Sequence, residues 1–330
     1  MRASFRALLA ALFSIGLLLT AGTGPAQADE VTPETAKPVR FISYNVCGAN
    51  CPLAVGSGTE AEVAAARAAW VSGLVAEVDT WDSDLVMLQE LCYGQWKLIR
   101  DALAPQRAGE DSYDTVWGAS LSSASGCGQW DAADRRFGLA IFSKGQGSVV
   151  AGTRTVTFLP EVPTAPTEDR ILLCAQTKLD GRVARACNTH IDFHDATTAL
   201  QIPKVAELAE AARQDGEAVV LAGDFNQVPE HADMNALYNH GTGSAGRFQE
   251  VDENDKAEFQ GTDCPQEAAR CRSGEETASP ACSDHTTETG KIDYLFLSYE
   301  WFKTVQGDAL PCTSGLSDHH LLRGAAAWEK

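Results

Sequence analysis

Short apolar runs recur along the chain, and polar or glycine-containing segments bound most of them, as is typical of buried strands. They comprise Val39–Val46, Leu85–Gln89, Tyr113–Ala119, Leu139–Ser143, Val149–Leu159, Ala218–Ala222, Ile292–Ser298 and Leu321–Trp328. The turn sequence Asp180-Gly181 separates Ile171–Leu179 from Arg182–Thr189 and predicts a tight β-hairpin.

Helical segments lie between these strands. Thr59 and Glu62 form a capping box that predicts the start of an alanine-rich helix, which we expect to end near Val78. Further helices are expected at Trp96–Leu103 and at about Ala196–Arg213, where apolar positions recur with helical spacing. Because strands and helices alternate along the chain, the sequence predicts a mixed α/β fold.

The stretch from Asn239 to Gly290 differs from the rest, because it is polar, rich in acids and cysteines, and shows little periodicity. Its segment Asp252-Glu253-Asn254-Asp255 resembles a calcium-binding loop but lacks the glycine that an EF-hand requires, so we expect a charged, solvated turn. Neither an internal repeat nor an interdomain linker is visible. Residues 39–330 are therefore expected to form one domain, preceded by a polar leader at 29–38.

The N-terminus carries the pattern of a secretory signal peptide. Arg2 and Arg6 precede an apolar run of about 15 residues, Ala7–Ala21, which is followed by Ala26-Gln27-Ala28. Such a run is shorter than the roughly 20 residues that span a bilayer, so a signal peptide at 1–28 is favoured over a membrane anchor. We expect cleavage near Ala28 and secretion of the mature protein.

The chain is strongly acidic. It has 26 basic and 45 acidic side chains and a net charge of −19, which becomes −21 without residues 1–28 because that segment holds two arginines and no acid. This balance argues against a broad basic surface for nucleic acid, where affinity comes from many Lys and Arg contacts to phosphate. It still permits an enzyme that meets phosphate locally through a metal ion.

All ten cysteines follow residue 28, and an even number in an exported chain predicts disulfides. Counting outward from the Asp180-Gly181 turn places Cys174 opposite Cys187 at a non-hydrogen-bonded site, where Cα atoms are about 4.5 Å apart and a disulfide fits. Zinc binding is disfavoured because no C-x-x-C spacing occurs. The later loops are expected to be cross-linked, with connectivity left open, by Cys264, Cys271, Cys282 and Cys312.

Polar residues stand where several apolar runs stop. They are Asn45, Glu90, His190, Asp224, Asn226 and the pair Asp318-His319. Strand ends at one edge of a sheet converge in space, which is how a scaffold assembles a site from distant parts of a sequence. Carboxylate and amide oxygens suit a hard cation such as Mg²⁺ or Ca²⁺, and imidazoles supply proton transfer near neutral pH.

Six short motifs occur in order from residue 39 to the C-terminus. They are Ser43-Tyr44-Asn45-Val46, Leu88-Gln89-Glu90, Asn188-Thr189-His190-Ile191, Gly223-Asp224-Phe225-Asn226, Lys291-Ile292-Asp293-Tyr294 and Ser317-Asp318-His319. Together they resemble the endonuclease/exonuclease/phosphatase superfamily, with its deoxyribonuclease I-like fold. The resemblance implies a four-layer α/β/β/α sandwich of two mixed sheets flanked by helices. It also implies a divalent-metal site at one end and hydrolysis of phosphodiesters or phosphomonoesters.

The resemblance assigns the metal site to three residues. Glu90 would be the principal ligand, with Asn45 and Asp318 beside it. Mg²⁺ would be the cofactor, with Ca²⁺ and Mn²⁺ as alternatives. Arg170, on a looser match, would contact the substrate phosphate.

The same resemblance assigns the proton-transfer and positioning roles. Asp224 and Asn226 would position the attacking water and the phosphate. His319 would be the general base, oriented by Asp293, and His190 would donate to a phosphate oxygen or to the leaving group. A second Ser-Asp-His sequence, ending at His285, precedes the Lys-Ile-Asp-Tyr motif instead of following it, so we expect His285 at the surface.

Several substrates remain open. We favour a secreted nuclease acting on nucleic acid, with Arg135 and Arg136 in a loop that could meet backbone phosphate. A sphingomyelinase or phospholipase C-like phosphodiesterase needs exposed apolar groups to seat on a membrane, and the long loop offers only Phe248 and Phe259. A small-molecule phosphomonoesterase is a third alternative, and a non-catalytic binding module is disfavoured by the complete motif set. No obligate protein partner is inferred, and we expect a monomer.

Overall fold

The computed structural model describes most of the chain after the N-terminal segment. The described residues are 31–53, 58–103, 111–164, 168–260, 262, 264–282, 289–312 and 316–330. The expected signal peptide at 1–28 and the Ser283-Asp284-His285 sequence lie outside them. Among the described residues, no helix is long and apolar enough to cross a membrane.

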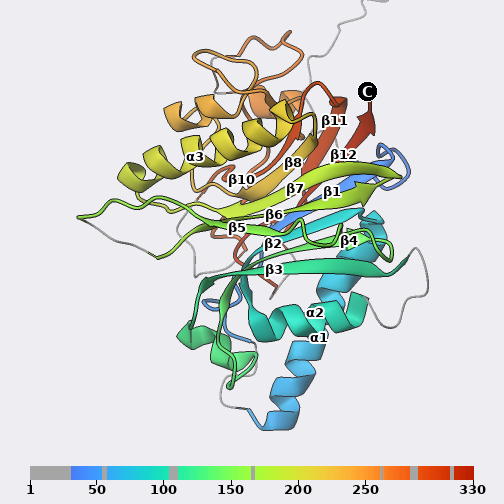
Figure 1. Cartoon of the computed structure of the whole chain (residues 1–330), viewed down its shortest axis with the longest axis vertical. Coiled ribbons are helices and arrows are strands. Elements are labelled where there is room, and N and C mark those ends of the chain that lie inside the picture. The colour runs from blue at the N-terminus through green and yellow to red at the C-terminus, as the bar shows by residue number, and fades with distance from the viewer. Residues whose placement is uncertain are drawn as a thin grey trace, which may run out of the picture.

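Two mixed six-stranded sheets form the centre of the molecule (Figure 1). The first has the order β11-β12-β1-β2-β4-β3, with β1 at Val39–Asn45, β2 at Leu85–Cys92, β3 at Tyr113–Leu121, β4 at Phe137–Lys144, β11 at Phe302–Ala309 and β12 at Leu322–Trp328. The second has the order β5-β6-β7-β8-β10-β9, with β5 at Thr155–Phe158, β6 at Ile171–Leu179, β7 at Arg182–His190, β8 at Ala218–Asp224, β9 at Phe248–Glu250 and β10 at Asp293–Ser298. The first and last strands of the chain, β1 and β12, lie side by side in the first sheet.

Helices cover the outer faces of both sheets. Helices α1 (Glu60–Trp81) and α2 (Tyr93–Leu103) lie on the first sheet, and α3 (Asp195–Gln214) lies on the second, on the opposite side of the molecule (Figure 1). Short 3₁₀ turns occur at η2 (Ser125–Gln129), η3 (Ala232–Ala236) and η4 (Lys256–Phe259). The predicted four-layer α/β/β/α sandwich is therefore confirmed.

Three buried clusters hold the four layers together, because successive residues of a strand point to opposite faces of its sheet. In β1, Ile42 packs outward with the α1 and α2 side chains, whereas Phe41 packs inward between the sheets. In β8, Val220 points inward and Leu221 packs against α3. Both faces of each sheet are covered, which explains why the strands appear in the sequence as continuous apolar runs instead of alternating ones.

Some expected elements differ from the structure. The apolar run Val149–Leu159 was expected to be one strand, but it contains only β5 and an isolated bridge at Val149. A turn interrupts the run, because Thr153 donates to the Val150 carbonyl and Gly152 has a φ of 77°. Strands β9 and β11 were not expected from the sequence. Helix α1 begins after the predicted Thr59 cap, where both capping-box hydrogen bonds form.

Five disulfides cross-link the described chain. They are Cys47–Cys51, Cys92–Cys127, Cys174–Cys187, Cys264–Cys271 and Cys282–Cys312. Cys174 faces Cys187 in the register of β6 and β7, the register that counting from the hairpin turn predicts, with Cα atoms 4.1 Å apart. The cysteine sulfurs are thus engaged with one another, and no cysteine is free.

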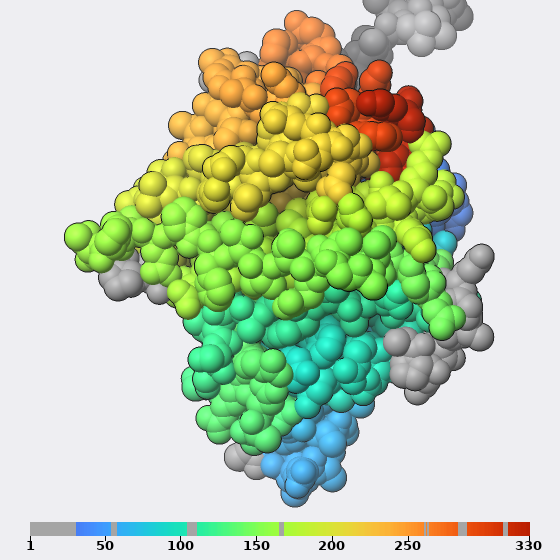
Figure 2. Space-filling model, in the orientation of Figure 1, coloured from blue at the N-terminus to red at the C-terminus, as the bar shows by residue number. Residues whose placement is uncertain are grey.

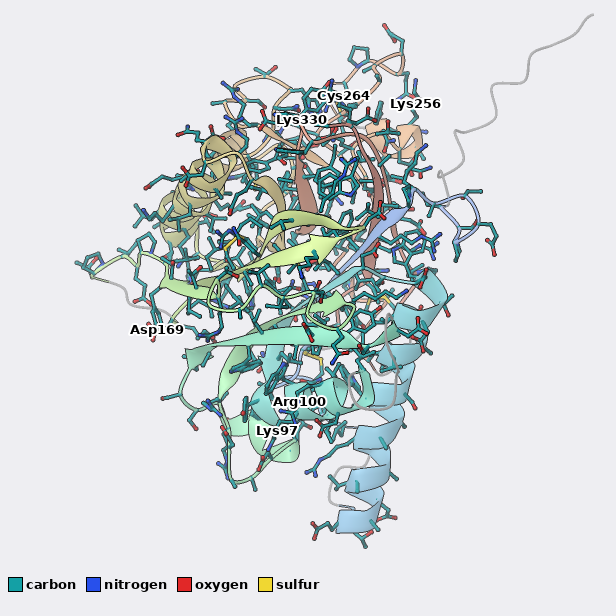
Figure 3. All side chains as sticks on the ribbon, turned by 45° about the vertical axis from the view of Figure 1, so that its right-hand side comes forward. Lys97, Arg100, Asp169, Lys256, Cys264 and Lys330 are labelled. Atoms are coloured by element: carbon teal, nitrogen blue, oxygen red, sulfur yellow. A yellow bond between two sulfur atoms is a disulfide. The ribbon has the colours of Figure 1, made fainter. Side chains whose placement is uncertain are left out.

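The described residues of the polar stretch 239–290 pack beside α3 at the upper end of the molecule, where Lys256 and Cys264 lie far from Lys97 and Arg100 on α2 (Figures 2 and 3). Its Asp252-Glu253-Asn254-Asp255 segment is not the solvated turn expected from the sequence. Asp252 and Glu253 are fully buried, and Asp255 is nearly so. The burial is possible because Lys291 and Arg270 reach these carboxylates from other parts of the chain.

Candidate active site

The register of the second sheet aligns three of the predicted site residues. His190, the last residue of β7, lies opposite Asp224, the last residue of β8. Asp224 in turn lies opposite Asp293, the first residue of β10. Because β7 and β8 are parallel and β10 is antiparallel to β8, one edge of the sheet brings together two strand ends and one strand start.

The first sheet contributes Asn45 and Glu90 from its parallel strands β1 and β2. The Asn45 amide nitrogen lies 3.2 Å from Glu90 Oε1, 3.0 Å from Asp224 Oδ2 and 3.4 Å from His319 Nε2, so it joins the two sheets at the site. Glu90 stands where the register between β2 and β4 shifts, with a positive φ of 53°. This irregularity of the strand turns the carboxylate, and backbone outliers of this kind concentrate at functional sites.

His319 is oriented by a carboxylate and by a serine. Its Nδ1 lies 2.8 Å from Asp293 Oδ2, which leaves Nε2 directed towards Asn45 and Asp224. Ser317 donates from Oγ to the Asn45 carbonyl at 2.6 Å and accepts from the His319 backbone N–H at 3.1 Å. The Ser-Asp-His segment is therefore fixed to the end of β1, and Asp293 fixes the tautomer of the imidazole.

Arg170 is part of the site and acts on His190. Its Nη1 lies 2.8 Å from His190 Nδ1, and since a guanidinium can only donate, Nδ1 must be the acceptor. The proton of a neutral His190 then sits on Nε2, which lies 3.6 Å from the acceptor Asp224 Oδ2. The Asn226 amide nitrogen, 3.2 Å from Nε2, is a donor and does not accept this proton. Asn226 has φ 49° and holds its place by donating to the Ile191 carbonyl.

Burial and neighbouring charges give the two histidines opposite properties. Burial lowers the pKa of His190 well below its ordinary value, and the Arg170 charge lowers it further, so this imidazole stays neutral. Burial also lowers the pKa of His319, but Asp293, with Asp224 behind it, raises that pKa well above its ordinary value. One histidine is a hydrogen-bond donor without charge, and the other has a high affinity for a proton.

The carboxylates at the site are short of positive charge. Burial raises the pKa of Glu90, and burial together with Asp293 raises the pKa of Asp224 to about 8. A bound divalent cation would supply the missing charge and let these groups ionise. The donor set of carboxylate and amide oxygens fits Mg²⁺, Ca²⁺ or Mn²⁺.

Two adjacent groups of ligand atoms could hold that cation. Asp224, Asp293 and His319 offer atoms within 4.8 Å of one another, but the hydrogen bond between Asp293 and His319 occupies one atom of each. Glu90 and Asn45 form the second group, although Asn45 Oδ1 accepts from the Cys47 N–H at 3.0 Å, so its amide would have to rotate to bind through oxygen.

The expected third ligand, Asp318, stays a prediction. It lies between Ser317 and His319 in the chain and beside the Cys47–Cys51 disulfide. Its negative charge still reaches the site, because it adds to the effect of burial in raising the pKa of Glu90.

Sequence reasoning missed some polar contacts that assemble the site. Gln89 donates to Asn188 Oδ1 at 2.8 Å, and Asn188 donates to the Leu88 carbonyl, so two motif residues link the sheets beneath Glu90. A small recess at the site is lined by Glu90, Arg170 and His190 together with Phe137. In the sequence, only the closeness of Gln89 to Glu90 and of Asn188 to His190 could have indicated that Gln89 and Asn188 support the site.

Solved structures of the same fold come from distant relatives. A mannosyl-6-phosphatase of Bacteroides thetaiotaomicron is 18% identical, with a TM-score of 0.58 over 88% of this chain and 99% of that chain. The catalytic domain of human Nocturnin, with a bound sulfate anion, is 15% identical, with a TM-score of 0.58 over 88% and 94%. TDP2 of D. rerio, in complex with a single-stranded DNA product, is 17% identical, with a TM-score of 0.52 over 88% and 99%.

A search of curated protein sequences finds no match. The sequence profile of the Endonuclease/Exonuclease/phosphatase family, in contrast, matches residues 42–319, which include all six motifs up to His319. The profile match covers the same motif residues that the structure brings together at one sheet edge. This chain belongs to the Endonuclease/Exonuclease/phosphatase family and is a phosphoric ester hydrolase.

Proposed function

We propose that the protein is a secreted, divalent-metal-dependent phosphodiesterase whose favoured substrate is nucleic acid. The observation that carries the proposal is the pair of histidines with opposite proton affinities around a carboxylate-rich centre. Cleavage of a phosphodiester needs a base for the attacking water and a donor for the phosphate or the leaving group, and the two histidines supply both.

In this proposal, His319 Nε2 takes a proton from the attacking water, and Asp293 stabilises the imidazolium that forms. Asp224 and Asn226 orient the water and the phosphate. His190 donates from Nε2, held in that tautomer by Arg170. When bound at Glu90 and Asn45, a divalent cation would offset the negative charge of the transition state.

Two observations favour nucleic acid over small phosphomonoesters: an exposed arginine side chain, and a structural neighbour described with DNA. Arg135 is exposed, whereas Arg136 is engaged with Asp134 and lies over the Tyr93 ring, so only Arg135 of the expected pair is available to phosphate. TDP2, which shares the fold, is described with a DNA product. A phosphomonoester is the alternative substrate, because the mannosyl-6-phosphatase shares the fold.

A phospholipid is the second candidate because of exposed aromatic side chains. Phe248 and Phe259 are buried, so the long loop offers no membrane contact through them. Phe193, three residues beyond His190, is instead 58% exposed, and Phe158, next to the residue that pairs with Arg170, is 59% exposed. Exposed apolar side chains beside a catalytic site are what an enzyme needs to seat on a lipid surface.

The test is a panel of plasmid DNA, RNA, sphingomyelin, phosphatidylcholine and p-nitrophenyl phosphate, each with Mg²⁺, Ca²⁺ or Mn²⁺. We expect cleavage of DNA or RNA that EDTA abolishes, with Phe193→Ser unchanged. Cleavage of lipid that Phe193→Ser impairs would establish the second candidate instead. Hydrolysis of p-nitrophenyl phosphate alone would overturn the phosphodiesterase assignment.

A further inference from the structure

The 239–290 stretch reaches the catalytic pair through one buried threonine. Thr277 is fully buried, and its Oγ1 accepts the backbone N–H groups of Ile292 at 3.0 Å and Asp293 at 2.9 Å. Strand β9 pairs with β10 only at Phe296–Ser298, so it does not extend to the start of β10. The Thr277 hydroxyl thus satisfies two N–H groups at that start.

The same residue also holds the segment that carries the base. The Thr277 carbonyl accepts from the His320 N–H at 2.8 Å, and Ala278 forms β-bridges with both Gly290 and His319. Thr277 and Ala278 therefore lie between the start of β10 and the His319 segment. The Cys282–Cys312 disulfide ties the chain just beyond them to the chain that leads into His319.

This arrangement matters because Asp293 and His319 belong to different sheets. Asp293 begins β10 of the second sheet, and His319 precedes β12 of the first. The Asp293 carboxylate meets His319 through Oδ2, while its buried Oδ1 has no hydrogen-bond partner among the described residues. The direction of the carboxylate is therefore set by the Asp293 backbone. Thr277 Oγ1 holds this backbone by accepting the Asp293 N–H.

We propose that Thr277 is a positioning residue, which fixes the spacing and angle of the His319–Asp293 pair from both sides. The hydroxyl holds the Asp293 backbone, and the carbonyl of the same residue holds the backbone next to His319. This inference rests on the proposed function, and it gives the otherwise unassigned 239–290 stretch a role in the reaction. Misplacing a reacting group by about 1 Å can cost on the order of 10²-fold in rate.

The test compares Thr277→Val, which removes the acceptor, with Thr277→Ser, which keeps it. We expect kcat to fall roughly 10–100-fold in the valine variant with KM unchanged, and the serine variant to stay within about twofold of wild type. Ser298→Ala is the matched control. Ser298 is fully buried at the far end of β10, and its hydroxyl accepts the Val219 N–H at 3.0 Å. Its loss should lower Tm without changing kcat.

Two further measurements separate positioning from general destabilisation. In an Asp293→Asn background, Thr277→Val should cause little further loss of kcat, because both changes act through the same pair. The proton NMR resonance of the His319 Nδ1–H should shift in Thr277→Val and return in Thr277→Ser, and this readout needs no substrate. Thr277→Ala replaces the valine variant if the latter does not fold.

A folded Thr277→Val variant with wild-type kcat, or one whose loss adds fully to that of Asp293→Asn, would overturn the inference. Failure of the proposed function looks different. In that case no phosphodiester is cleaved by the wild-type protein, while the NMR resonance still reports whether Thr277 holds the pair.

Discussion

Two regions of the molecule bury several carboxylates, and they differ in the cations that accompany them. At the sheet edge, the acids are Asp224 and Asp293, which are buried, and Glu90, which is half-buried. In the second region, which we call the loop cluster, they are Glu250, Asp252 and Glu253, all fully buried. The loop cluster contains its own cations, since Lys291 Nζ lies 3.4 Å from Glu250 and 3.5 Å from Asp252, and Arg270 lies 2.8 Å from Glu253.

The sheet edge is compensated differently. Its positive groups are His319, whose Nδ1 lies 2.8 Å from Asp293, and Arg170, which is directed to His190. Among the described residues, no lysine or arginine forms an ion pair with Glu90, Asp224 or Asp293. Raised carboxylate pKa values do not separate the two regions, because burial raises the pKa of Glu253 to about 8 as well. Backbone strain does separate them. Of the five described non-glycine residues with positive φ, Cys47, Glu90 and Asn226 lie at the sheet edge.

The comparison teaches that burial of acids alone does not identify a site. A cluster whose acids are paired with buried lysine or arginine has its charge compensated within the fold, whereas one that lacks such partners and sits on strained backbone is prepared for a cation from outside. The following variants test this distinction.

The largest effect should come from Glu90→Gln. Removing this charge should abolish turnover, a loss of at least roughly 10³-fold, because the cation that stabilises the transition state is no longer held. EDTA should have the same effect on the wild-type protein. The matched variant in the loop cluster, Glu253→Gln, should lower Tm and keep activity. Activity that persists in EDTA, or a Glu253→Gln variant that folds but is inactive, would contradict the comparison.

The next effect concerns proton transfer. His319→Ala should lose roughly 10²–10⁴-fold in kcat, the range for positioned proton transfer, and Asp293→Asn should lose a large part of the same factor. The double variant should be little worse than His319→Ala alone, because the pair acts as a unit. His285→Ala, in the second Ser-Asp-His sequence, should remain active. The reverse ranking of the two histidines in single-turnover assays would show that the assignment of the base is wrong.

The sequence predicted these residues better than it predicted the surroundings that give them their properties. Apolar runs such as Leu85–Gln89 identify strands because both faces of each sheet are covered, and the polar residue after each run then marks the sheet edge. Strand β9 is only three residues long in a polar stretch, so it leaves no pattern. The burial of Asp252 depends on Lys291, 39 residues away, and such a contact has no local signal.

Lys291→Met should remove the ion pairs that Lys291 makes with Glu250 and Asp252 in the loop cluster. Leaving Glu250 and Asp252 without their buried partner should lower the free energy of unfolding by about 3–5 kcal/mol, measured by urea denaturation. Lys256 is an exposed lysine in the 239–290 stretch, and Lys256→Met should change the free energy of unfolding by less than about 0.5 kcal/mol. Equal stability of the two variants would mean that Lys291 does not compensate the buried acids, and the distinction between the regions would fail.

The smallest effect should come from removing the Cys174–Cys187 disulfide, which we expect to lower stability without lowering activity. The Cys174–Cys187 disulfide joins β6 to β7 across 13 residues, and replacing both cysteines by serine should cost about 2–4 kcal/mol. Because the strands keep their ladder and the Asp180-Gly181 turn fixes the same register, kcat at a temperature where the variant is folded should equal that of wild type. Disulfide mapping that joins Cys174 to another cysteine would refute the register. A loss of kcat in the folded variant would mean that strain in β7 reaches His190, so that the sheet edge depends on the whole hairpin and not only on the residues at its end.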